Sequence, residues 1–167
     1  MIKPKINEII IFAVLLLMLA IIQVSVIPLL AIGTITPDLV LILVVIFALK
    51  YGQFNGTIYG AIAGLTFDLI SGGILGSAMF AKTISGFITG YFFNENKVDQ
   101  NLSTMYLLLV VFIAATVNSF FYLLIISSEI KLTVAHLIVE QGILPGLYTA
   151  LFVLPIVIFN QRNKSFG

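Results

Sequence analysis

The 167-residue chain has no cysteine, no tryptophan and a single histidine, and only 9% of its residues are charged. The lack of cysteine excludes disulfides, thiol catalysis and cysteine-based metal sites. One histidine argues against a dedicated metal site. The net charge of +1 offers no clustered basic surface for a nucleic acid. The sequence therefore predicts neither a cofactor nor a nucleic-acid partner.

Apolar residues are abundant instead, at 60% of the chain. A soluble domain usually carries about 25% charged residues, and its interior could not absorb so much apolar surface. The surroundings of this chain must be largely lipid, and its length suits five or six membrane spans with short loops. We predict an all-α polytopic membrane protein in which residues 1–167 form a single transmembrane domain.

Lys3 and Lys5 precede a long apolar run from Ile9 to Leu30. The pattern superficially resembles a secretory signal, whose apolar region is only about 7–15 residues and ends at a small-residue cleavage site. Here the run is longer and no convincing cleavage site follows. We expect an uncleaved first helix.

Apolar runs and turn signals together predict six helices and one amphipathic external segment. The second helix is expected to start at Thr36-Pro37-Asp38, with Thr36 as its cap, Pro37 at its first position and Asp38 in its first turn. The predicted helices cover about 7–31, 37–51, 56–70, 77–93, 102–127 and 141–159, and the amphipathic segment covers about 129–140.

Lysine and arginine are distributed unevenly between the two sides of a six-span arrangement. Lys131 lies alone on one side, and Lys82 lies inside a helix. The opposite side holds Lys3, Lys5, Lys50, Lys97, Arg162 and Lys164. Because cytoplasmic loops carry the excess of basic residues, both termini are expected in the cytoplasm. A five-span arrangement would weaken this asymmetry.

Small residues recur every four positions in the middle of the chain, which places them on one helix face. One row is Gly56, Gly60, Gly64, Asp68, Gly72 and Gly76, and the next helix has Ala78, Lys82, Gly86 and Gly90. Small residues let helix backbones approach closely in lipid, so the two helices are expected to form a tight antiparallel pair.

The same folding predicts an ion pair between Asp68 and Lys82 at the outer end of the hairpin. An ionisable residue within the membrane indicates a functional site by default, such as a proton or ion pathway. A structural pair is favoured because transport relays commonly use several buried acids. Asp68 is also a candidate to brace the turn Ser71-Gly72-Gly73 through its backbone amides.

The later helices carry a few further polar residues. Asn118 is expected to bond to a neighbouring helix, with a ligand contact as the second interpretation. A stripe in the amphipathic segment suggests a solvated or partner-facing surface, and its His136 and Glu140 lack a third metal ligand. The stripe consists of Glu129, Thr133, His136 and Glu140. No nucleophile, base and acid form a set, so we predict that the chain is not an enzyme.

These features, in their order, resemble the rod shape-determining protein MreD family. Pro37-Asp38 opens an apolar helix, a small-residue helix runs from Gly56 to Gly64, and the run from Asp68 to Gly73 is followed by Gly76. Size and hydropathy also agree over the whole chain. The residues that match the family pattern are Pro37, Asp38, Asp68, Ser71, Gly72, Gly73 and Gly76.

The resemblance implies a protein of the bacterial inner membrane that binds the bitopic protein MreC. It further implies a place in the elongation machinery with MreB, a RodA-type polymerase and a penicillin-binding transpeptidase, and no established catalytic activity. It also implies a six-helix bundle similar to the substrate-binding subunits of ECF transporters. A solute-binding subunit of such a transporter is therefore the alternative, with Asp68, Asn118 and segment 129–140 lining an outward-facing pocket.

Overall fold

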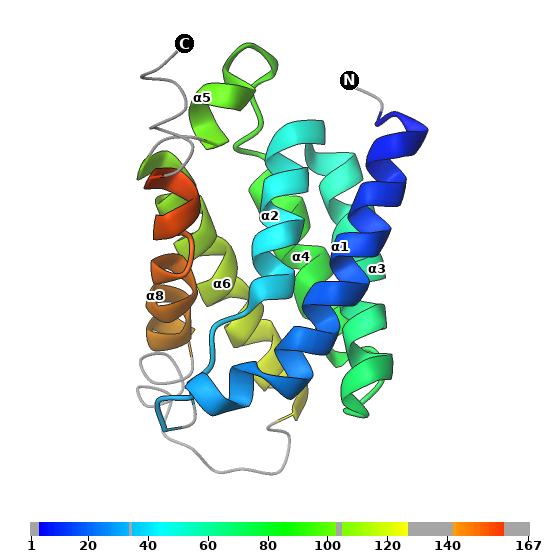
Figure 1. The fold of residues 1–167 in the computed structure, drawn as a ribbon, viewed down its shortest axis with the longest axis vertical. Coiled ribbons are helices and arrows are strands. Elements are labelled where there is room, and N and C mark those ends of the chain that lie inside the picture. The colour runs from blue at the N-terminus through cyan, green and yellow to red at the C-terminus, as the bar shows by residue number, and fades with distance from the viewer. Residues whose placement is uncertain (1–3, 34, 103–104, 127–141, 159–167) are drawn as a thin grey trace.

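A computed structural model describes residues 4–33, 35–102, 105–126 and 142–158, which form a helical bundle without β-strands in those ranges (Figure 1). A lone backbone bridge between Ile32 and Ile35 closes the turn after the first helical segment. The elements are α1 (Ile6–Ser25), η1 (Ile27–Leu30), α2 (Leu39–Tyr51), α3 (Gln53–Ser71), α4 (Ser77–Gly90), η2 (Glu95–Lys97), α5 (Val98–Leu102), α6 (Met105–Ile126) and α8 (Leu144–Leu151). The amphipathic segment expected at 129–140 lies outside the described residues.

Helix α2 is the central helix of the bundle and contacts α1, α3, α4 and α6 (Figure 1). Ten of its 13 residues are buried. A helix that is apolar on every side belongs in an interior, because no face of it needs a polar solvent. Its residues therefore pack into two hydrophobic cores, one shared with α6 and α8 and the other with α1 and α3.

The outer helices present apolar side chains outward. On α1, Ile10, Val14 and Leu17 are each more than half exposed, at 55%, 53% and 52%. Helices α1 and α6 are both long and apolar enough to cross a membrane. Such an exposed apolar surface fits a lipid environment, in which a helix satisfies its own backbone hydrogen bonds.

Proline ends one predicted helix early and interrupts another. Helix α1 stops at Ser25 and a 3₁₀ turn follows, because Pro28 has no N–H to donate to the carbonyl of Val24. Helix α8 stops at Leu151, and the chain is helical again at 154–158. Pro155 explains this interruption in the same way, since its ring would meet the Leu151 carbonyl.

The start of α2 also corrects an expectation. Asp38, not Thr36, caps the helix, and its Oδ1 accepts a hydrogen bond of 2.8 Å from the backbone N–H of Leu41. Asp38 stands directly before the first helical residue, where a short carboxylate reaches the third amide of the helix. The other end of α2 breaks at Gly52, whose φ of 84° lets α3 begin immediately afterwards.

Candidate functional site: a polar cavity at one end of the bundle

Helices α3 and α4 pack with their backbones in direct contact, as the glycine rows predict. A Cβ added at Gly60 would lie 2.2 Å from the carbonyl oxygen of Lys82, and one at Gly64 would lie 2.3 Å from that of Ala78. The opposite row is equally close, since a Cβ at Gly86 would lie 2.2 Å from the Gly56 carbonyl oxygen. At each of these glycines, a larger side chain would clash with the backbone of the facing helix.

The turn between α3 and α4 is stabilised by the buried carboxylate of Asp68. Its two oxygens accept hydrogen bonds from the backbone amides of Gly76 (2.9 Å), Ala78 (3.1 Å) and Met79 (3.1 Å), and from the hydroxyl of Ser77 (3.3 Å). The first amides of a helix have no intrahelical partners and favour a negative charge. Asp68 thus satisfies the N-terminus of α4 from the preceding helix.

The expected Asp68–Lys82 pair is wrong. The ammonium of Lys82 instead donates to Oδ2 of Asp38, which lies 44 positions away in sequence, and its side chain is only 3% exposed. Asp68 is occupied by the amides of α4, so it is not the partner that Lys82 needs. Asp68 does brace the turn, but through the backbone amides of Gly76 and the first residues of α4 and not through those of Ser71-Gly72-Gly73.

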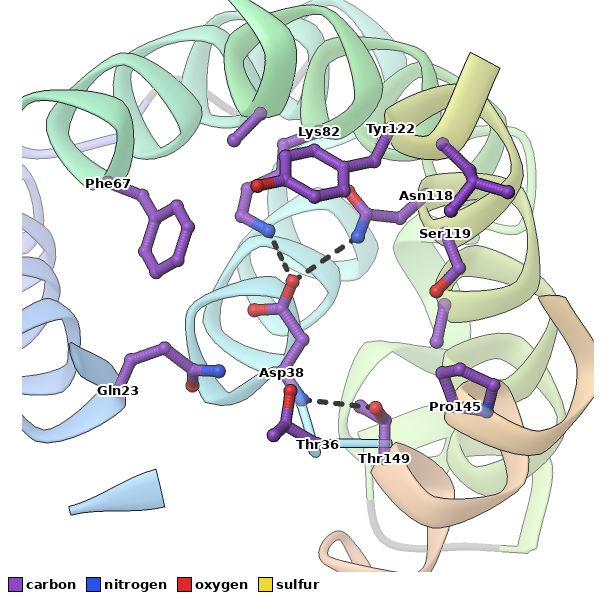
Figure 2. A pocket seen from close by; sticks show the side chains of 13 residues that line it. Gln23, Thr36, Asp38, Phe67, Lys82, Asn118, Ser119, Tyr122, Pro145 and Thr149 are labelled. Atoms are coloured by element: carbon purple, nitrogen blue, oxygen red, sulfur yellow. Dashed lines mark hydrogen bonds and ion pairs between the residues drawn. The ribbon is translucent and has the colours of Figure 1, made fainter. Parts of the chain in front are cut away.

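Asn118 of α6 completes this cluster by donating from Nδ2 to the same Asp38 oxygen at 3.3 Å. Figure 2 shows the Lys82 and Asn118 side chains converging on Asp38 from two different helices. The Lys82 ammonium also lies 5.3 Å from the centre of the Phe67 ring, within the range of a cation–π contact. One carboxylate therefore joins α2, α4 and α6.

The backbone around Asp38 is fixed just as closely. Gln23 of α1 donates from Nε2 to the carbonyl of Pro37 at 2.7 Å and accepts from the N–H of Leu39 at 2.8 Å. The N–H of Asp38 donates to the hydroxyl of Thr149 on α8 at 3.1 Å. The start of α2 is thus held by side chains from both sides of the bundle.

A cavity of about 240 Å³ lies at the end of the bundle that also holds η1 and the α3–α4 turn, and its wall includes Gln23, Asp38, Lys82, Asn118 and Thr149 (Figures 1 and 2). Ser119 and Tyr122 of α6 add two hydroxyl groups to its wall. The alternative function considered from the sequence placed Asn118 in a pocket, but with Asp68 and segment 129–140; it did not foresee the contribution of Gln23, which was visible only as an isolated polar residue in an apolar helix. Thr149 gave no signal, because a threonine is unremarkable in any helix.

A second, shallower cavity of about 500 Å³ lies at the opposite end. Its wall is mostly aromatic, from Tyr91, Phe92, Phe93 and Tyr106, with the side chain of Lys97 at its edge. Within the described ranges, no three His, Cys, Asp or Glu side chains lie close enough together to hold a metal ion. The stripe of Glu129, Thr133, His136 and Glu140 falls outside those ranges.

The sequence matches a known protein family over nearly its whole length. The family model of the rod shape-determining protein MreD matches residues 3–163. This chain belongs to the MreD family. No curated protein and no solved structure matches it.

Membership in the MreD family confirms the resemblance seen in the sequence and gives the chain a role in rod shape determination. MreD proteins are membrane proteins, which agrees with the two long apolar helices. The family is one of shape-determining proteins and not a known family of enzymes.

The residues of the MreD pattern divide between two structural roles. Asp68 and Gly76 belong to the α3–α4 turn, where Gly72 and Gly76 adopt φ angles of 68° and 94°. Ser71 donates to the backbone carbonyl of Asp68 at 3.4 Å, and Gly73 continues the turn. Asp38 instead lines the polar cavity, and the carbonyl of the adjacent Pro37 accepts a hydrogen bond from Gln23 of its wall. The pattern therefore marks both features of this end of the bundle.

Proposed function

We propose that this chain is a multi-pass scaffold of the bacterial inner membrane that binds MreC and so supports cell shape and side-wall peptidoglycan synthesis. The observation that carries the proposal is the polar cavity at one end of an otherwise apolar bundle. Buried polar groups in a membrane protein are costly and commonly mark function. MreB, a RodA-type polymerase and a penicillin-binding transpeptidase complete the proposed assembly.

The proposed topology has six spans, formed by α1, α2, α3, α4, α6 and the segment that contains α8, as in the substrate-binding subunits of ECF transporters. At about 1.5 Å per residue, the 13 residues of α2 reach about 20 Å, less than the hydrocarbon thickness of about 30 Å. The burial of α2 supports the proposal nevertheless, since neighbouring helices shield its ends from lipid.

The proposed orientation places the polar cavity on the outer side. Lys5, Lys50 and Lys97 lie at the opposite end of the bundle, around the start of α1, the end of α2 and η2 (Figure 1). At the cavity end, the described residues include no lysine or arginine apart from the paired Lys82. Because basic residues are enriched on the cytoplasmic side of membrane proteins, the end that carries Lys5, Lys50 and Lys97 is proposed to face the cytoplasm, together with both termini.

In this orientation the cavity faces the side on which the periplasmic part of a bitopic partner leaves the membrane. The apolar surface of the outer helices is available to the partner's transmembrane helix, and the cavity rim to the segment that follows it. A volume of about 240 Å³ is below the roughly 300–1,000 Å³ of sites for drug-sized ligands. It suits the insertion of a side chain or a short stretch of backbone.

Site-directed disulfide cross-linking tests the proposal. The chain has no cysteine, so each introduced cysteine is unique. Ser119→Cys places a thiol in the cavity wall, and Glu95→Cys places one at the other end as a matched control. Co-expressed MreC with single cysteines along its membrane-proximal periplasmic segment should cross-link to the Ser119→Cys variant and not to the Glu95→Cys variant. Failure of MreC to co-purify with the unmodified chain would refute the proposal.

The alternative, a solute-binding subunit of an ECF-type vitamin transporter, draws support from the same cavity. It predicts a small molecule that stays bound through purification and an energising module that co-purifies. Asn118 lines this cavity, whereas Asp68 is occupied by the α4 amides and segment 129–140 lies outside the described residues. The small volume makes the scaffold the better-supported function.

A further inference from the structure

The aromatic cavity, the second of the two cavities, lies at the end of the bundle that also carries α5 (Figure 1). It forms where α4 ends at Gly90 and the chain turns through Phe92 and Phe93 towards η2. Tyr106 of α6 supplies a further part of the wall, and its ring meets that of Phe92 edge to face at 6.3 Å. The volume of about 500 Å³ falls within the roughly 300–1,000 Å³ of small-molecule sites, so the cavity is large enough for a ligand.

One part of the wall continues a surface that faces lipid. Phe80, Phe87 and Tyr91 lie on the same face of α4 and its C-cap, and they are 50%, 47% and 75% exposed. The rings of Phe87 and Tyr91 are in edge-to-face contact at 6.2 Å. An exposed apolar row of this kind suits the acyl chains of a bilayer. Because Tyr91 also lines the aromatic cavity, the cavity borders on lipid.

Another part of the wall is polar and carries a cation, since it includes Asn94, Asn101 and Lys97. Oδ1 of Asn94 accepts a hydrogen bond from the backbone N–H of Asn96 at 3.1 Å, which leaves the NH₂ group of that amide as a donor. Neither of the two ion pairs among the described residues includes Lys97. Its neighbour in η2, Glu95, does not line the cavity. This part of the wall therefore offers N–H donors and a positive charge.

The aromatic cavity lies where α4 ends and α6 begins, and tyrosines such as Tyr91 and Tyr106 are enriched at the boundary between the membrane core and water. A molecule that fits both parts of the wall needs an apolar portion beside the rings and an anionic portion beside Lys97. Phospholipids have both portions and are present at this level around the chain. A zwitterionic headgroup would also bring its own cation close to Lys97, whereas an anionic headgroup carries only the negative charge of its phosphate.

We propose that the aromatic cavity binds one anionic phospholipid, whose phosphate contacts Lys97 and the asparagine amides and whose acyl chains follow the exposed face of α4. Basic pockets between membrane helices bind anionic headgroups in the same way. The proposal goes beyond the scaffold function, because it requires neither the bitopic partner nor a particular orientation in the membrane. The bound lipid would tie the α4–α6 end of the bundle to the charged surface of the bilayer.

Native mass spectrometry of the delipidated full-length chain, titrated in detergent with phosphatidylglycerol, measures the binding. Phosphatidylcholine with the same acyl chains is the zwitterionic comparison and should bind more weakly. Lys97→Gln should weaken the binding of the first phosphatidylglycerol about fivefold, the effect of one basic residue at an anionic surface, and Lys97→Arg should retain it. The matched control is Glu95→Gln, which removes a charge from the same element outside the cavity wall and should not weaken binding.

A second variant, Tyr91→Ala, tests the apolar part of the wall and should weaken the binding of both lipids. Equal affinities of the unmodified chain for the two lipids would overturn the proposal, as would phosphatidylglycerol binding that is unchanged in both Lys97→Gln and Tyr91→Ala. Lys97 and Tyr91 are exposed, so both variants should extract as folded monomers. Co-purification of MreC is measured separately with the same variants, and its loss from the unmodified chain would count against the scaffold function and not against the lipid site.

Discussion

Replacing Gly60 with alanine isolates the backbone contact between α3 and α4. The added methyl carbon would lie 2.2 Å from the carbonyl oxygen of Lys82, 2.8 Å from its carbonyl carbon and 3.1 Å from the Cα of Thr83. All three atoms belong to the backbone of α4, so no side-chain rotation can relieve the clash. The two helices must separate by about 0.8 Å for the shortest contact to reach even 3.0 Å.

Two effects of opposite sign compete in this substitution. Glycine to alanine inside a helix ordinarily stabilises by about 0.5–1 kcal/mol, since alanine loses less backbone entropy. Overpacking of a well-packed interface costs about 1–3 kcal/mol. The backbone clash should dominate, and a net loss of about 1–2 kcal/mol would lower the melting temperature by about 2–8 °C in a chain of this size.

Thermal unfolding in detergent, followed by circular dichroism, measures the effect. Gly73→Ala is the control, because its new Cβ would meet only the Ser71 hydroxyl at an ordinary 3.5 Å and its φ is not positive. The control should melt like the unmodified chain. A Gly60→Ala variant that melts at the same temperature or higher would show that α3 and α4 do not pack in this way.

Three further predictions concern the charged residues and the topology. Lys82→Met should destabilise the chain by up to about 3–5 kcal/mol, because it leaves the partly buried Asp38 carboxylate without its cation. Asp38→Asn combined with it should restore part of the melting temperature, and a double variant no better than the single one would contradict the pair. Asp68→Ala should destabilise the chain by about 2 kcal/mol or more, because the α4 amides lose their hydrogen-bond acceptor. Adding Lys82→Met should not recover this loss; recovery would mean that Asp68 and Lys82 form an ion pair after all. In intact cells, a membrane-impermeant maleimide should label Gly73→Cys without permeabilisation and Glu95→Cys only after it, and the reverse pattern would invert the proposed orientation.

The close α3–α4 pair could be predicted from the sequence because its signal is local and periodic. Gly56, Gly60 and Gly64 recur every four residues, and this spacing alone puts them on one face. The short turn then leaves α4 as the only helix that can fold back against that face at once. Periodicity and connectivity together determine which backbones meet.

The partner of Lys82 could not be predicted in the same way. Asp68 is close in sequence, and an antiparallel hairpin does bring it near α4. However, the unpaired amides at the start of α4 compete for the same carboxylate and bind it. Asp38 reaches Lys82 only because α2 occupies the centre of the bundle, and that placement depends on the packing of the whole chain.

The helix ends could have been placed better from local rules. Pro28 and Pro155 stand where they remove a backbone donor from a continuing helix, and both interrupt the helices that hydropathy alone extended through them. Hydropathy reports the length of an apolar run and not its conformation. Proline therefore takes precedence over hydropathy in setting an end.

Asp68, in the last turn of α3, and Asp38, at the cap of α2, differ in their exposure to the cavity, and this separates their roles. The oxygens of Asp68 accept four hydrogen bonds from the α3–α4 turn and the first turn of α4, and this buried carboxylate does not line the cavity. Asp38 accepts three hydrogen bonds, from Leu41, Lys82 and Asn118, and its side chain is 20% exposed beside the cavity. The Asp38 cluster is therefore the part of this end that is open to the proposed partner, and Asp68 holds the adjacent turn in place beside it.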